Sequence, residues 1–271
     1  MPVLLTAAAS GAQAQPLPSG GQLVAGSAAI AQTSPGKLSI VQSSDRATLN
    51  WQSFSIGQGN SVNVQQPGTH SMEIEQVVGN NVSQIFGRLT SNGQIVITNP
   101  NGIYFGPTSQ IDVAGLVAST AQASPAALAT FQAGGALNLD QVGRANAAIV
   151  NQGRITVSSA GLAAFVAPGL RNEGVIQAKL GTVQLASGTT ATLDFYGDGL
   201  VSLAVTGQTL AQAIGPDGKP LKAAVSNSGT ISAAGGTVLI TANVASGIVD
   251  QAINVKGCLL YTSDAADDLT R

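Results

Sequence analysis

The chain has 271 residues and a net charge of −2, and only 9% of its residues are charged, against roughly a quarter in an average globular protein. It offers no basic patch that could neutralise phosphates, so nucleic acids and anionic membranes are excluded as partners. Hydrophobic residues make up 44% of the sequence and there are 33 glycines. This composition favours many short strands joined by tight turns, in one main body.

Residues 1–14 have the features of a partial signal peptide. A short apolar run is followed by Ala-Gln-Ala, the small-x-small pattern that signal peptidase accepts, so we expect cleavage between Ala14 and Gln15. No basic segment precedes the apolar run, because Met1 leads directly into Pro2. A disordered, Ala-rich start of a cytosolic protein is the alternative. The rest of the chain has no run of about 18 apolar residues, so we expect no membrane-spanning helix.

A tight turn is predicted at Asn99-Pro100-Asn101-Gly102, between strand-like runs at 94–98 and 103–105. Proline presets φ at the second position of a type I turn, asparagine is tolerated at the third, and glycine suits the fourth. The Asn99 side chain can bond the backbone two residues further on. If Asn101 lies at the surface, Asn101→Asp should change the free energy of unfolding by no more than about 0.5 kcal/mol.

A short helix is predicted after this region. Ser124 suits an N-cap, Pro125 suits the first helical position, and Gly134 suits a C-terminal stop. An Ala-rich loop is the alternative.

An N-x-G-x-I unit recurs in the second half of the chain. It occurs at 151–155, 172–176 and 227–231, and a second apolar strand follows each copy. A period near 20 residues with Asn and Gly corners is typical of a parallel β-helix, which would place Ile155, Ile176 and Ile231 inward at equivalent positions. A β-sandwich or barrel would instead predict frequent hairpin turns, which are sparse. The corner residues predicted to stack are Asn151, Gly153, Asn172, Gly174, Asn227 and Gly229.

The tail, Cys258 to Arg271, differs from the rest of the chain. It holds the only cysteine, three of the thirteen acidic residues and one arginine, which together account for the whole net charge of −2. It resembles translated adapter sequence, so we expect a non-native segment that adds no coil. The predicted domain is therefore 15–257. The absence of cysteine from residues 1–257 suits a chain that crosses an oxidising compartment unfolded.

Few residues could support catalysis, and we expect no enzyme, no cofactor and no metal site. Glu73 and Glu75 could share a strand face, for which a solvated face is the expected use. Asp194 and Asp198 flank a predicted turn. The single histidine, His70, has no second histidine or cysteine to complete a metal site.

Several stretches resemble the haemagglutination-activity region of the filamentous haemagglutinin family, which is the two-partner secretion domain of large bacterial exoproteins. The resemblance runs from about Gln22 to Gly257. It is carried by WQSFSIG at 51–57, VNVQQPG at 62–68, VVGNNVSQIFGRLTSNGQIVITNPNGIYFG at 77–106, GLVAST at 115–120 and TLDFYGDGLVSLAV at 192–205.

The resemblance implies an all-β fold, a right-handed parallel β-helix with an N-terminal cap and short extra-helical elements. It also implies export through the periplasm to the surface of a Gram-negative bacterium. The partner would be an outer-membrane β-barrel transporter with periplasmic recognition domains, and the secretion motif would be Asn99, Pro100, Asn101 and Gly102. The chain departs from the family where an Asn-Arg pair is common, because it has Glu75-Gln76, and where Ile commonly precedes the turn, because it has Thr98.

We therefore expect the N-terminal secretion domain of a large exoprotein, an adhesin whose downstream regions would bind a host or surface glycan or receptor. Two alternatives are a stand-alone secreted β-helix that binds glycans and, less favoured, a β-helical polysaccharide lyase.

Overall fold

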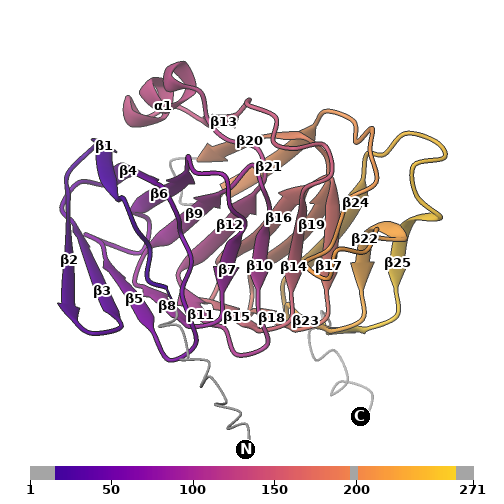
Figure 1. Cartoon of the computed structure of the whole chain (residues 1–271), viewed down its shortest axis with the longest axis horizontal. Coiled ribbons are helices and arrows are strands. Elements are labelled where there is room, and N and C mark those ends of the chain that lie inside the picture. The colour runs from indigo at the N-terminus through magenta and orange to yellow at the C-terminus, as the bar shows by residue number, and fades with distance from the viewer. Residues whose placement is uncertain (1–15, 196–200, 261–271) are drawn as a thin grey trace, which may run out of the picture.

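The computed structural model describes residues 16–195 and 201–260, which wind into a parallel β-helix with three long walls (Figure 1). The chain passes from the nine-stranded wall to the eight-stranded wall, then to the six-stranded wall, and back again. The parallel β-helix predicted from the N-x-G-x-I repeats is therefore confirmed. Signal cleavage at Ala14 and Gln15 falls outside the described residues.

Each wall is named by its number of strands. In spatial order the nine-stranded wall contains β2 (Ala28–Ser34), β3 (Lys37–Gln42), β5 (Ser61–Gln65), β8 (Arg88–Ser91), β11 (Gln110–Val113), β15 (Arg154–Val157), β18 (Val175–Ala178), β23 (Thr230–Ser232) and β26 (Cys258–Leu260). The eight-stranded wall contains β1 (Gln22–Ala25), β4 (Arg46–Trp51), β6 (Met72–Val77), β9 (Gln94–Thr98), β12 (Gly115–Ser119), β16 (Leu162–Ala167), β19 (Thr182–Ser187) and β24 (Thr237–Ala242). The six-stranded wall contains β25 (Gln251–Val255), β22 (Ala223–Asn227), β17 (Gly169–Asn172), β14 (Ala148–Asn151), β10 (Ile103–Phe105) and β7 (Ser83–Ile85).

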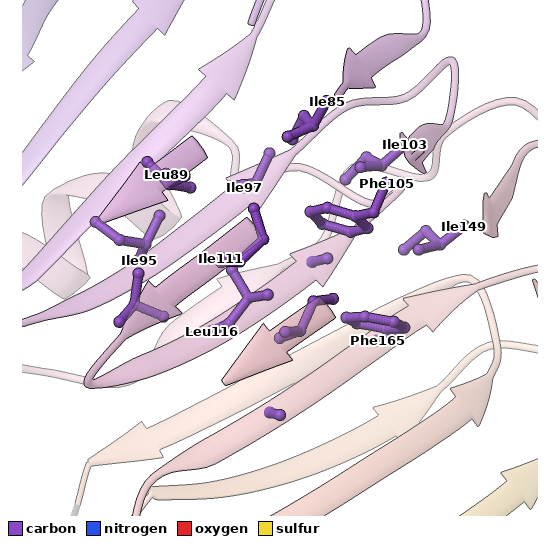
Figure 2. Packing of buried hydrophobic residues seen from close by; sticks show 14 of the residues in the cluster. Ile85, Leu89, Ile95, Ile97, Ile103, Phe105, Ile111, Leu116, Ile149 and Phe165 are labelled. Carbon is purple, nitrogen blue, oxygen red and sulfur yellow. The ribbon is translucent and has the colours of Figure 1, made fainter. Parts of the chain in front are cut away.

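Apolar ladders fill the space between the walls. Ile155 pairs with Ile176, and Ile176 with Ile231, and all three side chains are fully buried, as predicted. Figure 2 shows Leu89, Ile95 and Ile111 among the inward side chains of the two larger walls. Successive coils place the same side of each strand toward the interior, because parallel pairing keeps the register.

The first coils end in an antiparallel cap. β1 pairs antiparallel with β4, and β2 pairs antiparallel with β3, whereas all the other pairs within the three walls are parallel. An N-terminal cap is what the family resemblance implied.

Two insertions cover the outer face of the eight-stranded wall. One carries the helix α1 (Pro125–Gln132) and β13 (Leu137–Leu139), and the other carries β20 (Thr190–Phe195) and β21 (Val201–Thr206). β13, β20 and β21 form a small antiparallel sheet. The helix begins as predicted, because Ser124 accepts a hydrogen bond from the backbone N–H of Ala127 at 3.2 Å.

The outer cover creates a second apolar core. Met72, Ile74 and Val96 point outward from the eight-stranded wall and pack with Phe131 of α1 and Leu193 of β20. Strands β6, β12 and β16 of this wall are therefore buried on both faces, and every residue in them is buried.

We expected residues 258–271 to add no coil, but the first three of them add a strand to the nine-stranded wall. β26 pairs in parallel with β23, and Leu259 lies opposite Ile231 and packs on the interior. An apolar Cys-Leu-Leu segment can extend the ladder whatever its origin, because the ladder requires only an inward apolar side chain.

Among the described residues, no helix is long and apolar enough to cross a membrane.

Candidate functional site

The Asn99–Gly102 segment forms the predicted type I turn. The backbone N–H of Gly102 donates to the carbonyl of Asn99 at 3.1 Å, which closes the turn. Asn101, at the third position, does not have positive φ, which separates type I from type II, whereas Gly102 has φ +117°. A Cβ atom added at Gly102 would lie 2.9 Å from the carbonyl oxygen of Ala148 on the next coil. Glycine therefore serves both the backbone conformation and the stacking of coils at this position.

The two asparagines of the turn hold the segment that precedes β7. Asn99 is fully buried, and its Nδ2 donates to the carbonyl of Asn81 and to Oγ of Ser83, both at 2.9 Å. Nδ2 of Asn101 donates to the carbonyl of Gly79 and to Oδ1 of Asn99, again both at 2.9 Å. The side-chain amides thus tie the turn to backbone carbonyls of the preceding coil.

These contacts correct the expectation that Asn101→Asp would cost little stability. A carboxylate at this position could not donate to Gly79 or Asn99, and it would place negative charge beside their oxygens. The loss of a donor to a half-buried acceptor costs about 1–3 kcal/mol. The sequence predicted the turn itself, but it carried no signal for the contact with residues 79–83, which lie one coil away.

Apolar groups surround the polar turn. A small cavity of about 50 Å³ opens beside it, and its lining includes Val82, Asn101, Tyr104, Ile214 and Pro216. Val78 and Val82 belong to the segment that the asparagines hold, and their side chains are 46% and 39% exposed. We call residues 78–82 together with Asn99–Gly102 the turn surface.

The predicted corner residues stack in register over three coils. Nδ2 of Asn151 donates to Oδ1 of Asn172 at 2.7 Å, and Nδ2 of Asn172 donates to Oδ1 of Asn227 at 2.6 Å. All three asparagines are buried on the six-stranded wall. The middle amide, Asn172, therefore accepts from one neighbouring coil and donates to the other, so the ladder links three coils.

The three corner glycines stack with the asparagines. A Cβ atom at Gly174 would lie 2.2 Å from the carbonyl oxygen of Gly153, and one at Gly229 would lie 2.1 Å from that of Gly174. Only glycine allows the coils to approach so closely at this corner.

The expectation that Glu73 and Glu75 line a solvated face is wrong. Both side chains are fully buried, and they face the interior of the β-helix, where Glu73 lies beside Ile95 and Glu75 beside Ile97. Oε2 of Glu75 accepts a hydrogen bond from Nε1 of Trp51 at 2.5 Å. Glu75 stands where the family commonly has the Asn of an Asn-Arg pair, and its side chain lies inside the β-helix.

Burial raises the pKa of both carboxyl groups. For Glu73 desolvation is the main cause, and the neighbouring Glu75 raises its pKa further. For Glu75 desolvation again raises the pKa, while hydrogen bonds from Glu73 and Trp51 oppose the change. A carboxyl group without water or a cation is more stable when it keeps its proton.

The other residues considered for catalysis lie apart from this pair. Asp194 is on β20, outside the walls, and Asp198 lies outside the described residues. His70 is exposed in the loop before β6. Within the described part of the chain, no group of three or more His, Cys, Asp or Glu residues could hold a metal ion.

Comparisons with known proteins agree with the fold. Over 97 residues the chain is 43% identical to a heme/hemopexin-binding protein of Haemophilus influenzae, a match that covers 36% of this chain and 10% of that protein. Over 109 residues it is 40% identical to a heme/hemopexin-binding protein of strain Rd of the same species, which covers 40% of this chain and 12% of that protein. The matched part is thus about a tenth of the length of these relatives.

A solved structure matches over most of the chain. The crystal structure of the HMW1 secretion domain from Haemophilus influenzae superposes with a TM-score of 0.69 at 29% identity, covering 89% of this chain and 58% of that one. The sequence profile of the TPS secretion domain family matches residues 14–262. The three-walled β-helix and the Asn99–Gly102 turn accompany this match. Because the profile matches most of the chain, the chain belongs to the TPS (two-partner secretion) secretion domain family.

Proposed function

We propose that this domain directs a larger exoprotein of a Gram-negative bacterium through the periplasm to a partner outer-membrane transporter, which recognises the turn surface. The family match over residues 14–262 carries the first part of the proposal. The second part is supported by the combination of a rigid polar turn with exposed valines on the segment that it holds. Exposed apolar side chains beside fixed polar groups are typical of surfaces that bind another protein.

The structural role of the turn has to be separated from recognition. Gly102→Val would damage the turn, because valine disfavours positive φ and its Cβ would meet Ala148. We expect a cost of about 1–3 kcal/mol and a parallel loss of export. This variant therefore measures how export responds when the turn surface is distorted.

A surface substitution tests recognition directly. Val82→Thr changes an exposed side chain at the turn surface, and Val41→Thr changes a similarly exposed valine on β3, which is 47% exposed. Both should leave the free energy of unfolding within about 0.5 kcal/mol of the parent. Export should fall several-fold for Val82→Thr only. The measurements are urea unfolding of the purified domain and the ratio of secreted to periplasmic protein in cells with the cognate transporter.

Equal export of both valine variants would remove Val82 from the recognised surface. If Val41→Thr reduced export as strongly as Val82→Thr, the loss could not be assigned to the turn surface. Export that does not depend on the transporter at all would contradict the first part of the proposal.

A further inference from the structure

Two carboxyl groups lie inside the β-helix, where nearly all other side chains are apolar. Glu73 and Glu75 alternate on β6 with Met72 and Ile74, which point outward toward α1. On β4 the residues in register with the two glutamates are Ala47 and Leu49, which belong to the interior core. Parallel pairing keeps register partners on one face of the sheet, so both carboxyl groups point into the interior.

The interior supplies few partners for the pair. Apart from the contact between the two carboxyl groups themselves, Trp51 is the one side chain among the described residues that donates a hydrogen bond to the pair, at Oε2 of Glu75. The other three carboxyl oxygens have no donor in the described structure. Contact between the two carboxyl groups becomes a hydrogen bond only when one of them carries a proton.

On the described strands packed around the pair, no cationic side chain points toward the two carboxyl groups. On β4, Arg46 contacts the ring of Phe131 and donates to the carbonyl of Gly135 on the outer side of the wall. Strand β9 has no titratable residue. Across the interior, the charged residues of β3 and β8 are Lys37 and Arg88, and both are exposed. An unpaired carboxylate in such surroundings is strongly unfavourable, and the group is neutralised instead.

We propose that folding of this domain takes up protons at the Glu73–Glu75 pair, so that the β-helix is most stable in mild acid and loses stability as the pH rises toward neutrality and above. This proposal goes beyond the function proposed above and does not depend on it. Most proteins behave in the opposite way, because their surface carboxylates have lowered pKa values and acid unfolds them.

The direction follows from the raised pKa values. In the unfolded chain both glutamates ionise near their ordinary pKa of 4.5. Above that pH the unfolded state has released protons that the folded state still holds, and unfolding is favoured further with each unit. Each retained proton should raise the unfolding equilibrium constant about tenfold per pH unit, until the pH passes the raised pKa of the folded state.

The chain is suited to this measurement. It has one histidine, and histidine is the only side chain whose ordinary pKa lies between about pH 5 and 8. The single tryptophan is Trp51, which contacts Glu75, and its fluorescence reports unfolding of this region. Urea unfolding of the full chain at half-unit steps from pH 5 to 8 should show a midpoint that falls steadily with pH.

Glu73→Gln tests the source of the effect, because glutamine has the shape of the protonated glutamate and cannot ionise. The variant should flatten the pH dependence and be more stable than the parent at pH 8. Asp112→Asn is the control, since Asp112 is exposed on β11, and it should keep the steep dependence of the parent. An infrared band of a protonated carboxylic acid should be present in the folded parent at pH 7.5 and be reduced in Glu73→Gln.

Two results would overturn the proposal. One is a parent chain whose stability is constant or rises between pH 5 and 8. The other is a Glu73→Gln variant with the same pH dependence as the parent. If Glu73→Gln does not fold, the pH series and the infrared band of the parent decide alone, because neither measurement requires a variant.

Discussion

The eight-stranded and nine-stranded walls are built from similar strands but meet different surroundings. The nine-stranded wall faces the interior on one side and solvent on the other, so its strands alternate, as in β5 and β11, where buried residues are separated by exposed ones. The eight-stranded wall is covered on its outer face by α1 and the small sheet, so β6, β12 and β16 are buried throughout. Alternation of apolar and polar residues therefore identifies the inner face of a strand only where its other face is exposed to solvent.

The glutamates on β6 illustrate this limit. The sequence Met-Glu-Ile-Glu alternates apolar and acidic residues, which usually places the acids in solvent. Here the apolar side chains face the outer cover, and the acids face the interior. The alternating pattern therefore separated the two faces of β6 correctly, but it assigned the acidic face to solvent and the apolar face to the interior. A local pattern cannot show which face of a strand a distant insertion will cover.

The largest expected effect comes from removing the outer cover. Phe131 is fully buried and belongs to the second core, so Phe131→Ala should destabilise the domain by about 3–5 kcal/mol. Val41→Ala, on the solvent side of the nine-stranded wall, should cost no more than about 0.5 kcal/mol. Urea unfolding of both variants measures the contrast. A small effect at Phe131 would mean that the outer cover contributes little to the free energy of unfolding. Burial of both faces would then not distinguish the eight-stranded wall energetically from the nine-stranded wall.

The six-stranded wall extends the comparison to a polar interior. Asn172 donates to Asn227 and accepts from Asn151, so Asn172→Ala leaves buried amide groups without partners and should cost about 1–3 kcal/mol. Asn63→Ala is the matched control on the nine-stranded wall, because Asn63 donates to Thr90 at 2.8 Å in solvent. It should cost less than about 0.5 kcal/mol. Equal losses for the two variants in thermal unfolding would contradict a special role for the buried ladder.

The smallest of these effects concerns the connection between α1 and the eight-stranded wall. The guanidinium of Arg46 lies 4.6 Å from the centre of the Phe131 ring and donates to Gly135 at 2.9 Å. Arg46→Met keeps much of the apolar stem and should lose about 1–2 kcal/mol. Arg88→Met changes an exposed arginine on β8 and should be neutral within about 0.5 kcal/mol. Hydrogen exchange of the α1 amides should increase for Arg46→Met and stay unchanged for Arg88→Met.

Local signals predicted the elements that local chemistry determines. The N-x-G-x-I repeats predicted the coils and the stacked positions of Ile155, Ile176 and Ile231, because each coil repeats the same short sequence. Ser124 and Pro125 predicted the start of the helix, and the residues of the Asn99–Gly102 turn predicted its type. Caps and turns depend on a few adjacent residues, and the sequence states those directly.

The contacts between coils could not be predicted in the same way. Asn99 and Asn101 bind carbonyls at residues 79–81, about 20 positions earlier, and no pattern in the turn names that segment. The small sheet joins β13 to β20, although six coil strands, two from each wall, separate them in the chain. Such pairings depend on which surfaces the finished coils leave uncovered.

Among the described strands, those of the last coil have partners on one side and carry exposed apolar side chains. β24, β25 and β26 each pair on one side only, and the side chains of Leu239, Ile253 and Leu260 are 43%, 41% and 51% exposed. A free strand edge with apolar side chains is a template for another strand. For the purified domain this means that two molecules can join edge to edge at high concentration. Stability measurements on it therefore require dilute samples and a check by light scattering, so that loss of monomer is not mistaken for unfolding.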